Sequence, residues 1–309
     1  MIVGVIWNPA AGAGRMRRQW PKIRAALGKR FPDIRFVATE RPGHARDIAS
    51  ELVADGAELL VAVGGDGTIS EVADGLLRMG TAYASMVGLA VMPLGTGSDF
   101  ARGLGLPRGY DALAEAIETR PARIVDAGRM DLDVDDAPPG RHFINVASVG
   151  VSAEIAASVD GSRLTGRLRG RLAFYVHTVR HLLSYRFPLL RVWADGAIAY
   201  EGPVAAVVVA NGRWFGGGMK IAPDAALDDG LLDVAIIRGR SRLELVRALR
   251  LVYSGRHVGH PACLMLRARV VRVEALGGET VPVELDGERV AALPVRFEAL
   301  NGPISLRGA

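Results

Sequence analysis

The loop at residues 64–68 has the sequence Gly-Gly-Asp-Gly-Thr. Its three glycines allow the backbone to lie close to a ligand, and Asp66 is its single carboxylate. It follows an apolar run at residues 59–63 and opens a helical pattern, so its amide groups and the helix N-terminus can face a phosphate. Asp66 would repel phosphate unless a cation lies between them, which predicts a nucleotide bound with Mg²⁺. The alternative is a tight turn in which Asp66 only caps the helix. Thr68 and Glu71 have the spacing of a capping box at that helix start.

Three further loops follow apolar runs in the same way. They are residues 93–100 (Pro-Leu-Gly-Thr-Gly-Ser-Asp-Phe), residues 8–12 (Asn-Pro-Ala-Ala-Gly) and the turn that begins at Thr39. Ligands of parallel sheets bind at the carboxyl ends of the strands, where all four loops are expected. The chain has no G-x-x-x-x-G-K-[ST] and no G-x-G-x-x-G after its first strand, so neither a P-loop enzyme nor a dinucleotide dehydrogenase is indicated.

Four carboxylates are candidates to hold a metal ion or accept a proton: Asp66, Asp126, Asp286 and Glu288. Without a P-loop lysine, the charge of a triphosphate must be met by Mg²⁺ and backbone donors. An extended Asp286-Gly287-Glu288 turn would place two carboxylates on one side, and only one of them needs to take the proton of an alcohol. An ordinary hairpin turn is the alternative for these three residues.

The elements that must position these loops follow a regular order in the first 125 residues. Short apolar strands are expected at residues 2–7, 34–38, 59–63 and 87–92, and helical periodicity follows at residues 15–30, 44–54, 69–79 and 98–104. Strands that are apolar on both faces and alternate with helices predict a parallel sheet covered on both sides.

After Asp126 the pattern changes to short strands separated by Gly, Pro and Asp, which indicates an antiparallel β-sandwich. The expected strands are residues 142–149, 189–194, 204–210, 232–237, 263–273 and 281–285, with helices near residues 168–184 and 241–253. The predicted fold class is therefore α/β, with an N-terminal doubly wound parallel sheet and a C-terminal antiparallel β-sandwich. We expect a nucleotide-binding domain at residues 1–125, completed by residues 294–309, and a lipid-acceptor domain at residues 126–293.

The motifs together resemble the diacylglycerol kinase catalytic domain family, which includes bacterial YegS-like lipid kinases, sphingosine kinases and ceramide kinases. The matching motifs include N-P at residues 8–9, G-G-D-G-T at 64–68, P-L-G-T-x-x-D-F at 93–100, D-D-G-L-L-D at 228–233 and L-D-G-E at 285–288. The resemblance implies a fold like that of NAD kinases and an ATP-dependent lipid kinase of phospholipid biosynthesis. Such an enzyme transfers the γ-phosphoryl group of ATP to a hydroxyl of a lipid such as diacylglycerol, with ATP and Mg²⁺ as cofactors.

The resemblance also implies roles for particular residues. The expected ATP-binding residues are Asn8, Thr39, Gly64, Gly65, Asp66, Gly67, Thr68, Gly95 and Thr96. Ser98 stands where the family commonly has Asn, which weakens a hydrogen-bonding role for that side chain but still allows a helix cap.

The catalytic and metal positions come from the same resemblance. Glu288 matches the proton acceptor, with Asp286 beside it and Asp66 across the cleft. Asp229 matches a side-chain ligand of a structural Mg²⁺ site, to which Ala226 and Leu231 would add backbone carbonyls.

The stretch at residues 161–194 contains no Asp or Glu, and its apolar residues recur at helical spacing. Its arginines are Arg163, Arg167, Arg169, Arg171, Arg180, Arg186 and Arg191. A basic amphipathic helix of this kind can bind an anionic membrane. The alternative is a solvated arginine face on a helix packed against its own domain.

Composition narrows the class of protein. The 309 residues include 38 basic and 33 acidic side chains, a net charge of +5 that favours anionic partners. The single Cys263 excludes a disulfide framework and a cysteine-built metal site within the chain. No basic leader precedes the first apolar run, and no run reaches the ~18 residues of a bilayer span. We expect a cytoplasmic protein that contacts the inner face of the membrane peripherally.

Two alternatives to a lipid kinase stay open. An NAD kinase is one, although the Asn-Glu pair of those enzymes is absent; a non-catalytic lipid-binding module of the same fold is the other. Nucleic acid is not an expected partner, because stacking aromatics do not alternate with the basic residues. A homodimer through an edge strand is a further expectation, and the sequence leaves the acceptor lipid open.

Overall fold

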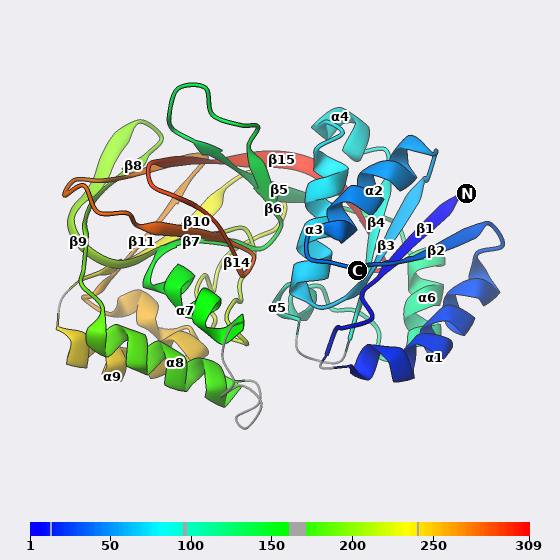
Figure 1. The fold of residues 1–309 in the computed structure, drawn as a ribbon, viewed down its shortest axis with the longest axis horizontal. Coiled ribbons are helices and arrows are strands. Elements are labelled where there is room, and N and C mark those ends of the chain that lie inside the picture. The colour runs from blue at the N-terminus through cyan, green and yellow to red at the C-terminus, as the bar shows by residue number, and fades with distance from the viewer. Residues whose placement is uncertain (13, 95–97, 161–170, 240) are drawn as a thin grey trace. The chain divides into compact units, whose positions relative to one another are not determined.

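The structure is a computed structural model that describes residues 1–12, 14–94, 98–160, 171–239 and 241–309 (Figure 1). The chain forms two compact units. The first unit comprises Met1–Ala127 and Leu300–Ala309, and the second comprises Gly128–Ala299. The first contains a parallel sheet and the second antiparallel strands, so the predicted fold class is confirmed.

The sheet of the first unit has the strand order β2-β1-β3-β4, with the end of β15 beside β4. All these pairs are parallel. The strands are β1 Val3–Trp7, β2 Ile34–Ala38, β3 Leu59–Gly64, β4 Gly88–Pro93 and β15 Val295–Arg307. Every residue of β3 is buried, as expected for a central strand covered on both faces.

Helices cover both faces of this sheet (Figure 1). Val3 and Val5 pack with α1 and α6, whereas Gly4 between them faces Leu52 of α2, because side chains alternate across a strand. α3 packs beside α2 and α4 follows it. The helices are α1 Arg15–Arg30, α2 His44–Ala54, α3 Asp66–Leu77, α4 Thr81–Ala84, α5 Asp99–Arg102 and α6 Tyr110–Thr119.

The second unit contains two antiparallel sheets that share strand β9. One has the order β11-β10-β9-β7-β13-β14, and the other has the order β9-β8-β12-β15. The bounds are β7 Val146–Gly150, β8 Leu189–Ala194, β9 Ala197–Ala210, β10 Leu232–Arg238, β11 Cys263–Ala268, β12 Val270–Ala275, β13 Pro282–Leu285 and β14 Glu288–Ala292. A pair, β5 Arg123–Leu132 and β6 Arg141–Phe143, completes the strands. Side chains of both sheets, such as Val209 and Phe297, share one core.

A second apolar layer covers the outer face of the sheet that contains β7, β9 and β10. Val207 and Val209 of β9 point into the sandwich, while Ala206 and Val208 pack with helices on the other side. The helical elements are α7 Val151–Asp160, α8 Arg171–Ser184, α9 Arg242–Ser254 and the 3₁₀ turn Arg256–Gly259. The strand β9 is therefore buried on both faces in its second half.

Two expected strands are each divided in the structure. Residues 142–149 form β6 and β7 with a turn between them, because the Asp286 carboxylate binds the amides of that turn. Residues 263–273 form β11 and β12, which pair with different sheets. The break lies at Arg269, whose amide donates to the Asp195 side chain. The alternation of apolar and polar residues along a sequence does not show where the chain passes from one sheet to another.

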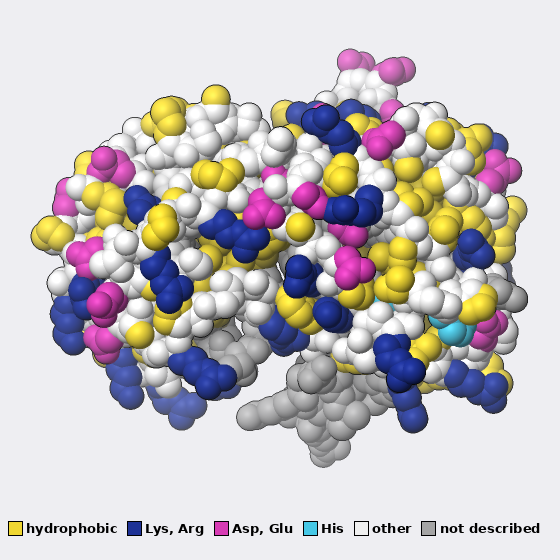
Figure 2. Space-filling model, turned by 180° about the vertical axis from the view of Figure 1, so that it is seen from behind, with side chains coloured by type: hydrophobic (Ala, Val, Ile, Leu, Met, Phe, Trp, Pro, Cys, Tyr) yellow, Lys and Arg dark blue, Asp and Glu magenta, His cyan; other side chains and the backbone are white. Residues whose placement is uncertain are grey.

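Lys and Arg side chains are spread over the surface of both units on the face shown in Figure 2. The arginine-rich residues 161–170 of the expected membrane-binding stretch lie outside the described residues. Further along, Thr178 and Leu182 of α8 are buried, as is Tyr185 directly after it, and Leu183 is half exposed. Among the described residues, none of the helices has both the length and the apolar character needed to span a bilayer.

Candidate active site

A cavity of about 600 Å³ lies in the first unit, at the carboxyl ends of the strands. It is lined by Asn8 after β1, by Thr39 after β2, and by Gly67 and Thr68 at the start of α3. The volume is within the range of small-molecule sites. The structure thus brings together three of the four loops selected from the sequence. Gly95 and Thr96 of the fourth loop lie outside the described residues.

The side chain of Thr68 turns back over Gly64. A Cβ at Gly64 would lie 2.5 Å from the Thr68 hydroxyl oxygen, so only glycine leaves room for it. Asn8 Nδ2 donates to that hydroxyl oxygen at 3.3 Å, and Asn8 Oδ1 accepts from the Ala10 amide at 2.9 Å. Gly65 and Gly67 have open space where a Cβ would be. The loop is therefore fixed at Gly64 and Thr68 and open to a ligand at its other two glycines.

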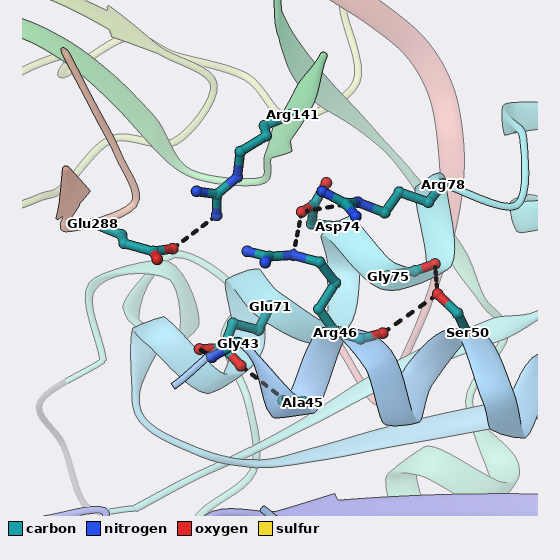
Figure 3. Close-up of polar contacts among 10 residues, drawn as sticks. All are labelled: Gly43, Ala45, Arg46, Ser50, Glu71, Asp74, Gly75, Arg78, Arg141 and Glu288. Atoms are coloured by element: carbon teal, nitrogen blue, oxygen red, sulfur yellow. Dashed lines mark hydrogen bonds and ion pairs between the residues drawn. The ribbon is translucent and has the colours of Figure 1, made fainter. Parts of the chain in front are cut away.

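The predicted capping box at Thr68 and Glu71 is wrong. Helix α3 begins at Asp66, so Thr68 already lies inside it, and no side chain caps this helix. Glu71 instead accepts hydrogen bonds from the amides of Gly43 and Ala45 at 2.9 and 3.0 Å (Figure 3). It caps the N-terminus of the neighbouring helix α2, and so fixes the turn after Thr39 that borders the cavity.

A buried ion pair fixes α2 against α3 (Figure 3). Asp74 of α3 is 1% exposed, and its Oδ2 lies 2.5 Å from Nε of Arg46 and 3.4 Å from Nε of Arg78. The Ser50 hydroxyl donates to the carbonyl of Gly75 at 2.9 Å. At Gly75 a Cβ would lie 2.3 Å from the Arg46 carbonyl oxygen, so the two helices approach as closely as their backbones allow. The loops before α2 and α3 are positioned by this contact.

The Asp66 carboxylate caps a helix other than its own. Its oxygens accept from the Ser98 hydroxyl, from the Asp99 amide at 2.9 Å and from the Phe100 amide at 3.2 Å. Ser98 is the N-cap of α5 and accepts from the Ala101 amide. Three donors thus share the charge of Asp66. A carboxylate has about four lone-pair sites, so these three donors leave one site for a cation.

Asp126 and Asp286 hold backbone segments in the same way. Asp126 is 1% exposed, and its Oδ1 accepts from the Gly302 amide at 2.7 Å. Asp286 accepts from the amides of residues 144, 145 and 146 at 3.0, 3.1 and 2.8 Å. Asp286 and Gly287 form the two-residue turn between β13 and β14, with φ of 48° and 95°, as in a type I′ hairpin. The hairpin alternative weighed from the sequence is the conformation found.

Glu288 differs from the other three carboxylates. It is the first residue of β14, its side chain is 51% exposed, and it forms an ion pair with Arg141 of β6 at 2.7 Å (Figure 3). Asp66, Asp126 and Asp286 are used by backbone amides, whereas Glu288 contacts a side chain and faces solvent. Glu288 is therefore the carboxylate of this set that is best placed to meet a substrate.

The loop expected to hold a structural metal contains an ion pair. Asp229 Oδ1 accepts from the Leu231 amide at 3.1 Å, and Oδ2 binds the Arg267 guanidinium. The described residues include no group of three or more His, Cys, Asp or Glu arranged to hold a metal ion. The predicted site has one carboxylate and two backbone carbonyls, and in this structure Arg267 neutralises that carboxylate, so Mg²⁺ would have to displace the arginine; the metal site stays a prediction.

Asp233 lies beside this ion pair, with Oδ2 3.6 Å from the Nε of Arg267. Burial raises the pKa of Asp233 to about 6; the charge of Asp224 adds to the rise, and Arg213 opposes it. This carboxyl group is therefore partly protonated near pH 6.

An apolar cavity of about 100 Å³ lies in the second unit, between the sheet and its covering helices. Ala205 and Val208 of β9 form one wall, and Val151, Leu182 and Leu249 come from α7, α8 and α9. The described lining includes no Asp, Glu, Lys or Arg. Helix α7 also packs against β13 and β14, so it lies between this cavity and the hairpin of Glu288.

Two ionisable residues of this cavity, His257 and Cys263, are uncharged at neutral pH. Burial lowers the pKa of His257, whose Nε2 lies 2.9 Å from the Ile221 carbonyl oxygen. Burial also raises the pKa of the Cys263 thiol to about 11. The sequence patterns did not predict this cavity. The available signal was the apolar run at residues 204–210, which has no polar face and so requires cover on both sides.

The chain matches two protein families along most of its length. Residues 3–130 match the family described as "Diacylglycerol kinase catalytic domain". Residues 145–307 match the family described as "YegS C-terminal NAD kinase beta sandwich-like domain". The two matches cover both units.

Relatives of similar length support the same grouping. A "Diacylglycerol kinase" of Bacillus subtilis is 30% identical over 295 residues, 95% of this chain and 91% of that protein. A "Probable lipid kinase YegS-like" of Pseudomonas aeruginosa is 34% identical over 286 residues, 92% and 88% of the two chains. The crystal structure of a diacylglycerol kinase from Bacillus anthracis superposes with a TM-score of 0.71 at 23% identity, covering 100% and 97%, which shows the shared fold. The chain therefore belongs to the family of diacylglycerol kinases and YegS-like lipid kinases, and it is a kinase.

Proposed function

We propose that this kinase uses ATP and transfers the γ-phosphoryl group to a hydroxyl of a lipid such as diacylglycerol. Family membership supports the general reaction. Two features of the structure support the finer statement. One is the cavity at the carboxyl ends of the strands in the first unit, and the other is the apolar cavity of the second unit.

The cavity of the first unit is the proposed ATP site. Gly67 lines the cavity and has open space beside its Cα, which lets a phosphate approach the backbone, and Asn8, Thr39 and Thr68 supply polar side chains. Mg²⁺ bound with ATP would neutralise part of the charge of the phosphates. Asp66 is the residue that would hold this ion, because the three donors it already binds leave one lone-pair site on its carboxylate.

The apolar cavity is the observation on which the lipid assignment rests. Its described lining has no Asp, Glu, Lys or Arg, so it suits an alkyl chain and not the phosphates and ribose of NAD. In this conformation its 100 Å³ holds only a short alkyl segment. A longer chain requires α7, α8 and α9 to separate from the sheet.

Glu288 is the proposed proton acceptor. As the lipid hydroxyl oxygen forms its bond to the γ-phosphorus, the bond from phosphorus to the bridging oxygen breaks, ADP leaves, and the hydroxyl proton passes to the Glu288 carboxylate. Arg141 orients this carboxylate through their 2.7 Å ion pair. Asp286 supports it indirectly, because its bonds to the amides of residues 144–146 hold the hairpin in place.

The test is phosphoryl transfer to separated acceptors. Purified protein is incubated with γ-labelled ATP and Mg²⁺ and either a total lipid extract or NAD, and the labelled product is identified by mass spectrometry. We expect a labelled lipid and no labelled NADP. Glu288→Gln should form no product. Ala248→Trp, which fills the apolar cavity from α9, should lower lipid phosphorylation and leave ATP binding unchanged.

Labelled NADP in place of labelled lipid would favour an NAD kinase. Binding of ATP and lipid without transfer would favour the non-catalytic module. Full transfer activity in Glu288→Gln would contradict the role of that residue.

Cytoplasmic location, peripheral contact with an anionic membrane and homodimer formation stay predictions from the sequence. Sedimentation with anionic liposomes tests the second. If replacement of Arg167, Arg169 and Arg171 by Ala leaves liposome binding unchanged, the stretch at residues 161–194 is not the membrane contact.

A further inference from the structure

Arg17 of α1 lines the 600 Å³ cavity of the first unit. The other basic residue of the lining, Arg41, forms an ion pair with Asp47 at 2.7 Å. Arg17 is exposed, and no ion pair or hydrogen bond joins it to another described residue. A guanidinium group that borders a cavity without an anionic partner is available for an anion that enters it.

An aromatic cluster fixes the side of α1 that bears Arg17. Trp20, one turn further along the helix, stacks on Trp7 with ring centroids 4.1 Å apart and planes at 7°. Trp20 also meets Phe36 edge to face at 5.5 Å, and the Arg24 guanidinium lies over the Phe36 ring at 5.2 Å. Residues 17, 20 and 24 share one side of the helix. The cluster therefore holds this side of α1 against β1 and β2, whose ends border the cavity.

The cavity needs a cation if a triphosphate is to bind in it. Its lining contains Glu40 and Glu71, and Glu71 is occupied by the amides of Gly43 and Ala45. No lysine is present in the described lining, whereas P-loop enzymes use a lysine at this point of the reaction. A guanidinium group can donate two parallel hydrogen bonds to phosphate oxygens, which makes arginine well suited to the task.

We propose that Arg17 binds the polyphosphate of the nucleotide in this cavity. It would thus provide the positive charge that a lysine provides in P-loop enzymes. The inference rests on the proposed ATP site but concerns a residue outside the glycine-rich loop. It assigns Arg17 to nucleotide binding and not to proton transfer.

The test compares a phosphate-bearing ligand with one that has no phosphate. Calorimetric titrations measure the binding of a non-hydrolysable ATP analogue, with Mg²⁺, and of adenosine to the wild type, Arg17→Ala, Arg17→Lys and Arg18→Ala. Arg18 is the matched control, because it is also exposed on α1 but does not line the cavity.

We expect Arg17→Ala to bind the ATP analogue about 10-fold or more weakly, as for the loss of a hydrogen bond between charged groups. Adenosine binding should not change. Arg17→Lys should recover part of the affinity, and Arg18→Ala should match the wild type. In steady-state assays Arg17→Ala should raise KM for ATP more than it lowers kcat. Its melting temperature without nucleotide should equal that of the wild type.

Equal affinity of Arg17→Ala and the wild type for the ATP analogue would overturn the inference. An equal loss in Arg18→Ala would also overturn it, because the effect would then come from general basic charge. A wild type that binds neither ligand would overturn the proposed ATP site, and this inference with it. Loss of affinity for adenosine in Arg17→Ala would show a disturbed cavity and would likewise count against a specific phosphate contact.

Discussion

Replacing Asp66 by Ala should disturb both catalysis and folding. From the sequence alone, this carboxylate belongs to the nucleotide loop, and its loss would affect only activity. In the structure it also accepts hydrogen bonds from the Ser98 hydroxyl and from the amides of Asp99 and Phe100. Ala leaves all three donors without their acceptor, so the loop after β4 and helix α5 lose the group that holds them to α3.

The size of the effect follows from these three bonds. A hydrogen bond to a charged acceptor contributes about 1.5 to 3 kcal/mol. Asp66 is half-buried, so water can form hydrogen bonds with some of the donors that Ala leaves unpaired. We therefore expect the free energy of unfolding of the first unit to fall by about 2 to 4 kcal/mol. For a unit of this size that corresponds to a melting temperature lower by roughly 5 to 10 °C.

Glu288→Ala is the comparison. This side chain is half exposed, and its ion pair with Arg141 is an interaction of at most about 1 kcal/mol. Differential scanning calorimetry should find its melting temperature close to that of the wild type. Phosphoryl transfer to lipid should be lost in both variants. If Asp66→Ala melts at the wild-type temperature, its carboxylate does not hold the loop, and the reasoning fails.

Three more predictions concern stability and metal binding. Gly64→Ala should lower the free energy of unfolding by about 1 to 3 kcal/mol, because its Cβ would overlap Thr68; an unchanged urea midpoint would contradict this. Burial raises the pKa of Asp233 from 3.8 to about 6, so the stability this group contributes is fully present below pH 3.8 and is lost as the pH rises through 6. The difference in free energy of unfolding between Asp233→Asn and the wild type, measured with urea, should therefore shift in favour of the variant by on the order of 1 to 3 kcal/mol from about pH 4.5 to about pH 8. The same difference at both of these pH values would refute this prediction. Mg²⁺ should raise the melting temperature of Arg267→Ala more than that of the wild type, because the arginine occupies Asp229; equal responses would mean that this carboxylate binds no metal in either protein.

Local sequence patterns predicted the four strands β1–β4 and the helices α1 and α2 of the first unit closely, but they missed α4 and α6. Helix α1 spans Arg15–Arg30 and strand β2 spans Ile34–Ala38, as the periodicity indicates. Both elements are defined by which side chains avoid water, and this information lies in neighbouring residues. The parallel sheet and the antiparallel second unit follow from the same patterns. The glycine-rich loops could be selected for the same reason, because a strand followed by Gly-Gly-Asp-Gly-Thr is a local feature.

The hydrogen-bond partners of the polar side chains could not be predicted from local sequence patterns. Glu71 has the spacing to cap its own helix but caps α2, 26 to 28 residues earlier in the chain. Asp66 binds a loop 32 to 34 residues later, and Asp286 binds amides 140 to 142 residues earlier. Each carboxylate accepts from whichever unpaired donors the folded chain brings near, and spacing along the sequence does not encode that proximity.

What the sequence by itself determined is the order of strands and helices, the glycine-rich loops and the family. Only the tertiary structure decided which carboxylates support the backbone and which one is left facing solvent. It also decided that Arg17 reaches the cavity beside the nucleotide loop and that an apolar cavity lies beneath α7, α8 and α9. The physical reason is the distance along the chain over which each feature is set. Periodicity comes from neighbouring residues within one element, whereas a cavity or an unpaired charge depends on surfaces that several distant segments contribute.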